Sequence, residues 1–199
     1  MSIAAADVKS LRDRTGAGMM ECKRALEEAS GDTDKAIEIL RVKGQASAAK
    51  RGERDAAEGV VADYVHFNNQ VGALVEVNCE TDFVARNEEF VEFVRQIAIH
   101  IASAAPRWVS EDEVPEEVLE QERAVLEQQA DESKPPEVRA KITEGRLRKW
   151  LQEVVLLNQE HVNADKHDGR TIEQLRADIA SKTGENVVIR RFARFEVGG

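Results

Sequence analysis

The hydrophobic pattern of this chain changes period at Gly59, and the change limits the fold to helices combined with a small antiparallel sheet. Residues 59–67 and 71–79 are two runs rich in β-branched residues. Residues 68–70 between them (Asn-Asn-Gln) have the composition of a hairpin turn. A third run, residues 187–197, alternates between two sides as a strand does. We therefore expect an α+β core domain over residues 59–199, with about three antiparallel strands and helices on one face.

Residues 4–44 instead show helical spacing, which predicts three short helices. The Gly-Ala-Gly of residues 16–18 ends the first helix, residues 30–32 separate the second from the third, and Gly44 closes the third. These helices predict a small bundle over residues 1–45, sized for binding rather than catalysis. Residues 46–58 are Ala-rich and charged without a sustained apolar stripe, so we interpret them as a helical linker.

Further helices are expected inside the core domain. Asn87 caps a helix whose apolar positions keep a 3.6-residue period until Pro106 stops it. Residues from about 115 to 151 are typical of a helical hairpin that protrudes from the core, with its turn at residues 133–136. Its first arm is acidic, because residues 111–132 hold ten acids and one base. Thr171 caps a last helix, which Gly184 ends.

The charge of the chain argues against nucleic acid as a direct partner. There are 38 acidic and 28 basic residues, for a net charge of −10, whereas affinity for nucleic acid comes from neutralising phosphates. Residues 41–54 and residues 139–149 are local exceptions, each with five bases and one acid. We interpret both stretches as solvated helix faces.

Other protein classes are excluded by what the sequence lacks. No apolar run approaches the roughly 20 residues of a membrane helix, and the N-terminus resembles neither a signal nor a transit peptide. Cys22 and Cys79 cannot form a disulfide framework or a zinc site. A cytoplasmic protein remains, in which we expect both cysteines to be buried and reduced.

No catalytic apparatus is recognisable, so we expect a protein that is not an enzyme and that needs no cofactor or metal. The four histidines are scattered, and there is no phosphate-binding loop, nucleophile elbow or zinc-protease motif. Asp82 with Glu80, Glu88 and Glu89 could suggest a cation site, but the spacing of a calcium loop is absent. Acids at a helix start are the better interpretation.

Two features leave a choice between core and contact surface. Met19 and Met20 follow the Gly-rich turn, where they could fill the small core or form an adaptable binding surface. Phe83 lies in a polar stretch between a strand and a helix, where it could be a core residue. It could also protrude beside the carboxylate of Asp82 as an apolar wedge.

The same two segments carry a resemblance to the bacterial elongation factor Ts family. The first motif is Leu11-Arg-x-x-Thr15-Gly-Ala-Gly-Met-Met-x-Cys-Lys-x-Ala-Leu26, and the second is Glu76-Val-Asn-Cys-x-Thr81-Asp-Phe-Val-Ala-Arg. The likeness extends to His100-Ile-Ala, to Glu144-Gly-Arg and to Ile189-Arg-Arg-Phe-x-Arg-Phe-Glu-Val197. It covers essentially the whole chain in order.

The resemblance implies guanine-nucleotide exchange on elongation factor Tu in translation. The bundle would resemble a ubiquitin-associated (UBA) domain, and it would dock on the nucleotide-binding domain of that partner. The family's pattern places the docking surface at Leu11, Arg12, Met19 and Met20. It implies that Thr81, Asp82, Phe83 and Val84 intrude beside the nucleotide and dislodge Mg²⁺. His100 would support a contact that presses on the phosphate-binding loop.

The chain resembles the short form of the family, since it has one core unit where longer members carry two. In the long form the wedge and the histidine come from different subdomains, whereas here Phe83 and His100 are only seventeen residues apart. We therefore expect a homodimer that rebuilds the missing half, with the C-terminal strand pairing across a two-fold axis. Two alternatives to exchange are a helical adaptor that binds a protein partner, and a nucleotide-using enzyme, which would need a phosphate-binding loop.

Overall fold

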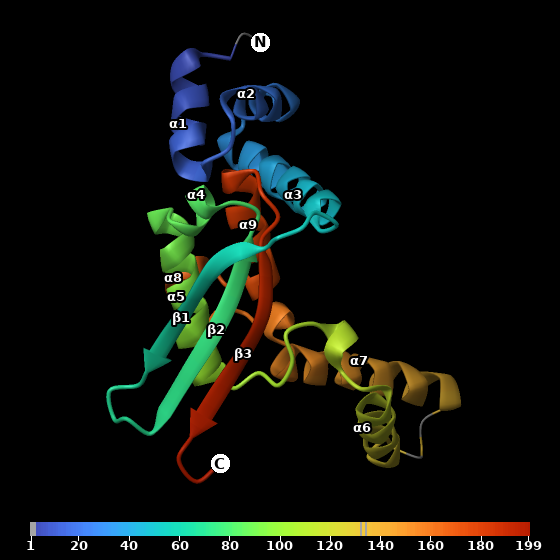
Figure 1. Ribbon diagram of the computed structural model, residues 1–199. Helices are drawn as coiled ribbons and strands as arrows, with labels where there is room; N and C mark the ends of the chain where they lie inside the picture. Colours follow the sequence, from blue (N-terminus) through green and yellow to red (C-terminus); the bar gives the residue numbers. More distant parts are fainter. Residues whose placement is uncertain (1–2, 132, 134) are drawn as a thin grey trace. The chain divides into compact units, whose positions relative to one another are not determined.

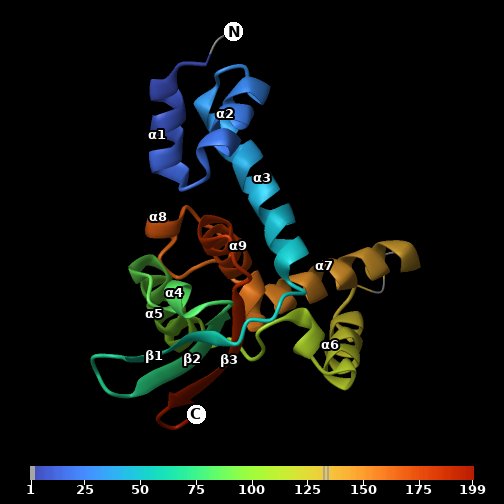
Figure 2. The same cartoon turned by 45° about the horizontal axis from the view of Figure 1, so that its top comes forward.

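The computed structural model describes residues 3–131, 133 and 135–199 of the chain (Figures 1 and 2). The helices are α1 (Ala5–Thr15), α2 (Met19–Glu28), α3 (Thr33–Arg51), α4 (Asp82–Ala85), α5 (Glu88–Ala104), α6 (Glu116–Gln128), α7 (Pro136–Val154), α8 (Ala164–His167) and α9 (Ile172–Thr183). Two short 3₁₀ turns are η1 (Glu111–Glu113) and η2 (Leu156–Asn158), and the strands are β1 (Glu58–Val65), β2 (Val71–Cys79) and β3 (Val188–Glu196). The predicted turn over residues 133–136 includes Lys134, which lies outside the described residues.

The first three helices pack into the predicted bundle around a small apolar core. Its buried members are Val8, Leu11, Cys22, Ala25, Leu26, Ala29 and Ala36. The turn between α1 and α2 follows the Gly-rich sequence, because Gly16 adopts φ 69° and donates its N–H to the Arg12 carbonyl at 2.8 Å. Glycine takes this left-handed conformation at the lowest cost, because it has no Cβ atom.

The predicted end of the third helix at Gly44 is wrong, since α3 continues to Arg51. A Cβ atom built on Gly44 would lie 3.3 Å from the Ser181 hydroxyl of α9, which is tighter than an ordinary contact. Gly44 therefore permits close approach between two helices inside α3 and does not stop it. The region expected to be a helical linker is helical only as far as Arg51.

The three strands form one sheet in the order β1-β2-β3, with β2 in the centre. β1 and β2 form the predicted hairpin, and the Val197 N–H donates to the Gln70 carbonyl at 2.9 Å, which joins the end of β3 to the start of β2. Alternate residues of β2 are buried: Ala73, Val75, Val77 and Cys79. Helix α5 lies behind the sheet in Figure 1. The α+β prediction is confirmed.

The predicted helical hairpin is present as α6 and α7. Pro115 precedes the first turn of α6, and Pro136 occupies the first turn of α7, where a missing N–H costs nothing. An ion pair at 3.1 Å joins Arg123 of α6 to Glu144 of α7. This pair links the single base of the acidic arm to an acid of the basic arm.

The chain divides into two compact units. One comprises Met1–Val60, Val77–Phe93 and Gln174–Val188, and the other comprises Val61–Glu76, Val94–Glu173 and Ile189–Gly199. The bundle and α4 belong to the first unit, whereas the helical hairpin and His100 belong to the second. The division into residues 1–45, 46–58 and 59–199 stays a prediction.

Candidate functional site

The segment that the sequence singled out around Phe83 is a sharp turn followed by the one-turn helix α4. Thr81 is the N-cap of α4, with extended backbone angles (φ −128°, ψ 156°). Its hydroxyl oxygen accepts the Val84 N–H at 3.4 Å. A threonine oxygen at this position satisfies one of the free N–H groups of a helix start. The helix begins here because Thr81 supplies that cap.

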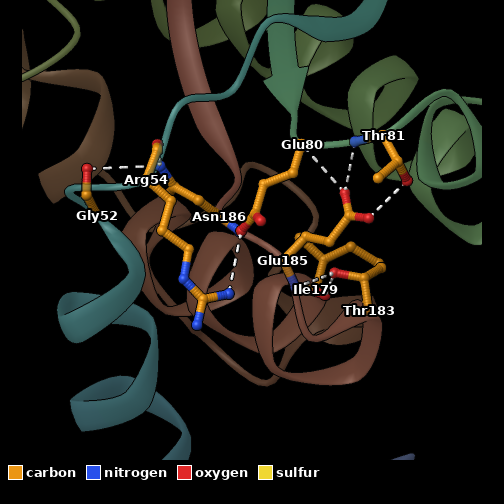
Figure 3. A network of polar contacts seen from close by, with 8 residues as sticks. All are labelled: Gly52, Arg54, Glu80, Thr81, Ile179, Thr183, Glu185 and Asn186. Carbon is orange, nitrogen blue, oxygen red and sulfur yellow. Dashed lines mark hydrogen bonds and ion pairs between the residues drawn. The ribbon is translucent and has the colours of Figure 1, made fainter.

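A carboxylate from a distant part of the chain holds this turn (Figure 3). Glu185 follows α9 and accepts the Glu80 N–H at 3.0 Å and the Thr81 N–H at 3.1 Å. It also accepts the Thr81 hydroxyl at 2.6 Å. Three hydrogen bonds to one charged acceptor fix the backbone of Glu80 and Thr81 directly before α4.

We call the three hydrogen bonds from Glu80 and Thr81 to the Glu185 carboxylate the Glu185 clamp. A hydrogen bond in the opposite direction, from the backbone after α9 to a side chain after β2, accompanies it. The Asn186 N–H donates to the Glu80 carboxylate at 2.6 Å, so each segment binds the other's backbone. Arg54 lies 3.4 Å from the same carboxylate oxygen. The Asn186 side-chain amide donates to the Arg54 carbonyl at 2.8 Å. The end of β2, the segment after α3 and the segment after α9 are thus joined by one polar network (Figure 3).

Phe83 projects from this clamped turn into solvent. It is 81% exposed, so the alternative that it is a core residue is wrong. Asp82 beside it is half-buried and forms an ion pair at 3.0 Å with Arg86 one turn later in the chain. Val84 is half-buried. The arrangement presents one large apolar side chain on a backbone that the Glu185 clamp holds in place.

Cys79, the last residue of β2, contacts the same turn from the buried side. It is completely buried, and its thiol donates to the Thr81 carbonyl at 3.3 Å. Burial, together with the nearby carboxylates of Glu185 and Glu58, raises the pKa of this thiol to about 11. Cys22 is buried as well, and both cysteines are free, as expected.

Of the four residues predicted to form a docking surface at the α1–α2 corner, three are exposed and one is buried. Met19 is 48% and Met20 is 59% exposed, so neither fills the core of the bundle. Arg12 is exposed too. Leu11 is completely buried in the bundle core, contrary to its expected place on the docking surface. It sits on the inner face of α1, and it supports the corner from inside.

His100 lies in the other compact unit and is completely buried. Its ring stacks on that of His161 with centroids 5.3 Å apart, and the rings of His161 and His167 are 4.1 Å apart. His100 Nε2 contacts the Gln159 side-chain oxygen at 2.9 Å, and its Nδ1 accepts the Val162 N–H at 3.2 Å. It therefore positions the segment around residue 162 and offers no atom to a partner.

This histidine cluster is held in the neutral form. Because Nδ1 of His100 and Nδ1 of His161 each accept a backbone N–H, their protons are on Nε2. Burial lowers the pKa of His100 to about 4 and also lowers the pKa of His161. For His167, burial and the neighbouring His161 lower the pKa to about 4.

Sequence reasoning missed the residues that hold these features. Glu185 and Asn186 directly follow a helix stop, where polar residues are common, and their partners lie about a hundred positions earlier. The four histidines are scattered in the sequence, yet His161 stacks on His100 and His167 lies against His161. No local pattern signals either contact, because both depend on chain segments that are far apart in the sequence.

Two classes of feature are absent from the part of the chain that the structure describes. No group of three or more His, Cys, Asp or Glu side chains is arranged to hold a metal ion, including the acids around Asp82. Every described helix is too short or too polar to span a bilayer.

The comparisons with known proteins agree with the motifs. Residues 3–168 match the family model described as Elongation factor TS. A protein of Thermosipho melanesiensis called elongation factor Ts is 51% identical over 98% of this chain and 99% of its own length. The elongation factor Ts of Carboxydothermus hydrogenoformans is 55% identical over 96% of this chain and 87% of its own. That of Rubrobacter xylanophilus is 54% identical, with 96% of both chains covered.

Proposed function

This chain belongs to the elongation factor Ts family, a family of translation elongation factors, and we propose that it promotes guanine-nucleotide exchange on elongation factor Tu. The observation that carries the proposal is the placement of Phe83. It is 81% exposed on a one-turn helix whose start is fixed by Glu185. An aromatic side chain that stands in water on a fixed backbone is available for contact with a partner, and aromatic residues are enriched at protein–protein interfaces.

The proposed mechanism uses Phe83 as a wedge and Asp82 as its polar neighbour. Burying a phenylalanine against a partner contributes about 2 kcal/mol, which is available to distort the partner's nucleotide site. Mg²⁺ holds a nucleotide by bridging its phosphate oxygens. When Thr81, Asp82, Phe83 and Val84 enter beside the nucleotide, they shift the ligands or the water shell of that Mg²⁺. GDP is then held more weakly, without any covalent step.

The energetics require only thermodynamic linkage. A protein that binds nucleotide-free elongation factor Tu more tightly than the GDP complex must weaken GDP binding by the same factor. The direction of exchange is then set by the relative concentrations of GTP and GDP. The protein itself is unchanged, and we propose that it acts in the cytoplasm without a cofactor and without touching nucleic acid.

We propose that the bundle supplies the docking contact. Arg12, Met19 and Met20 are exposed at the α1–α2 corner, where flexible methionines adapt to a partner surface. Leu11 holds this corner from the core. The likeness of the bundle to a UBA domain belongs to the proposal. His100 acts through the segment that it positions, since the ring itself is buried.

A homodimer is the proposed assembly, because the chain carries one core unit. β3 lies at an edge of the sheet, so one side of its backbone is open to pairing with a second copy. Large apolar residues on the same sheet are exposed (Val61, Val65, Leu74 and Phe195), as is Val197 directly after β3. Static light scattering at micromolar concentration is expected to give the dimer mass, and a monomer mass would refute this assembly.

Release of a fluorescent GDP analogue from elongation factor Tu tests the exchange proposal. Stopped-flow traces in excess unlabelled GDP should show strong acceleration by the wild-type protein and much less by Phe83→Ala. Phe67→Ala is the matched control, because Phe67 is 86% exposed in the turn between β1 and β2. Circular dichroism verifies that both variants are folded.

The outcomes separate the candidate functions. Acceleration lost in Phe83→Ala and kept in Phe67→Ala supports the wedge. No acceleration by the wild type overturns the exchange proposal and favours a helical adaptor that only binds. Equal loss in both variants would mean that exposed phenylalanines act nonspecifically.

A further inference from the structure

The basic stretch at residues 41–54 does more than face solvent, because much of it lines a cavity. The cavity has a volume of about 410 Å³ and is walled by α3, α2, the α1–α2 turn and Ser181 of α9. Its charged lining residues are Arg24, Lys43, Lys50, Arg51 and Glu21. Ser47, Ser181 and the apolar side chain of Leu40 also line the cavity.

One face of α3 builds most of this cavity. Leu40, Gly44, Ser47 and Arg51 recur every three or four residues, so they project from the same side of the helix. Gly44 lies opposite Ser181, and a Cβ atom at Gly44 would stand 3.3 Å from the Ser181 hydroxyl. Figure 2 shows α3 running beside α9. The glycine thus keeps α9 close enough to close one side of the cavity.

The cations of this cavity are poorly compensated. Lys43 forms an ion pair with Glu28, and the Glu21 carboxylate accepts the Gly18 N–H at 3.2 Å. Within the described residues, Arg24, Lys50 and Arg51 have no carboxylate partner. The Nη1 atom of Arg51 is moreover buried without a hydrogen-bond acceptor. A buried guanidinium nitrogen is costly to leave unpaired, so this site favours an anion that supplies oxygen atoms.

We propose that this cavity binds a small anion carrying two or more linked phosphate groups. Arginine presents a planar fork of donors that matches phosphate oxygens, and serine hydroxyls and lysine ammonium groups add single donors. The volume falls in the range of small-molecule sites. Four cations around one cavity suit a ligand with several negative charges, whereas a chain of net charge −10 repels a long nucleic acid. Inorganic polyphosphates and nucleoside di- or triphosphates share this chemistry.

Isothermal titration calorimetry with inorganic tripolyphosphate, at constant ionic strength and without elongation factor Tu, tests the proposal. The double variant Lys50→Gln/Arg51→Gln should weaken binding about tenfold or more, because it removes charge-assisted hydrogen bonds. The matched control is Arg148→Gln/Lys149→Gln, which removes an adjacent exposed Arg and Lys from the other basic stretch. It changes the net charge equally and should leave the affinity nearly unchanged.

A second variant and a second pair of ligands sharpen the test. Arg24→Gln removes a cation from a different helix and should also weaken binding, so misfolding of α3 alone cannot explain both losses. Titrations with pyrophosphate and with GDP distinguish the sources of phosphate: equal affinities assign recognition to the phosphates, and tighter GDP binding adds a contact with the nucleoside at the apolar wall.

The proposal is wrong if tripolyphosphate gives no saturable heat. It is also wrong if the α7 control loses as much affinity as Lys50→Gln/Arg51→Gln, since that result would mean only general charge attraction. Because elongation factor Tu is absent from these titrations, their outcome is independent of the exchange activity.

Discussion

Removing Glu185 should both destabilise the protein and slow nucleotide exchange, although Glu185 is not in any signature motif. Its carboxylate accepts hydrogen bonds of 3.0, 3.1 and 2.6 Å from the turn before α4. A hydrogen bond to a charged group contributes about 1.5–3 kcal/mol when buried, but Glu185 is only half-buried and Thr81 is exposed. We therefore assign about 1 kcal/mol to each bond, or about 3 kcal/mol to the clamp.

We expect slower exchange because the Glu185 clamp orders the backbone before Phe83 in the free protein. In Glu185→Ala the backbone of Glu80 and Thr81 loses its acceptor, and Phe83 must be ordered during docking at a cost of about 1–2 kcal/mol per residue. GDP release from elongation factor Tu should then be accelerated about tenfold less than by the wild type, since 1.4 kcal/mol corresponds to a factor of ten. Thermal unfolding should begin several degrees lower.

Two further variants isolate the geometry. Glu185→Gln keeps a carbonyl oxygen for the two backbone N–H groups, and its amide can donate to the Thr81 hydroxyl, so most of the exchange activity should remain. Glu120→Ala removes an exposed carboxylate of α6 and should change neither property. Stopped-flow GDP release and circular dichroism melting measure both effects. If Glu185→Ala exchanges and melts as the wild type does, the clamp does not position Phe83.

Three other predictions concern stability. In unfolded chains His100 and His167 have pKa values of about 6.5, against about 4 in the fold, so the unfolded state binds protons first as the pH falls. The contribution of these histidines to the free energy of unfolding should be fully present above pH ~6.5 and should be lost between there and pH 4, by about 3 kcal/mol for His100 alone. Urea unfolding at pH 7, 5.5 and 4.5 measures this loss. The loss should be smaller in His100→Gln, and a free energy of unfolding that does not change with pH would contradict the prediction. Gly59→Ala should destabilise by about 1–3 kcal/mol, because its Cβ would stand 2.3 Å from the Val77 carbonyl oxygen. Gly145→Ala in α7 meets nothing within 4 Å and should be neutral or stabilising in the same denaturant titration.

The fold was predictable to the extent that hydrophobic period determines it. Both strands of the hairpin, β3, and the long helix α5 follow from alternation or from 3.6-residue spacing. The predicted helix end at Gly44 is wrong because the local sequence does not distinguish two roles of glycine. A glycine can end a helix, or it can lie inside a helix where a neighbouring helix packs closely. The difference depends on Ser181, which is 137 residues later in the chain.

The exposure of Phe83 could not be decided from the sequence for a related reason. Helix α4 has one turn, which is too short for a period to distinguish an inner from an outer face. The acids around Asp82 indicate a helix start, but the sequence places the start of the helix at Asn87 and does not predict the separate turn α4. A helix start alone also does not say which side chain faces solvent. The long-range contacts with Glu185 and Asn186 hold the turn in the direction that exposes Phe83.

The positions of Leu11 and His100 show why a sequence motif mixes two kinds of residue. Both lie in segments that resemble the family's signatures, and both are completely buried. A substitution of Leu11 would therefore reduce docking by loosening the bundle core, whereas one of Met20 would act at the surface itself. The two can be separated experimentally, because only the first lowers the unfolding temperature. Motif membership alone therefore does not separate residues that can touch a partner from residues that hold others in place, whereas burial does separate them.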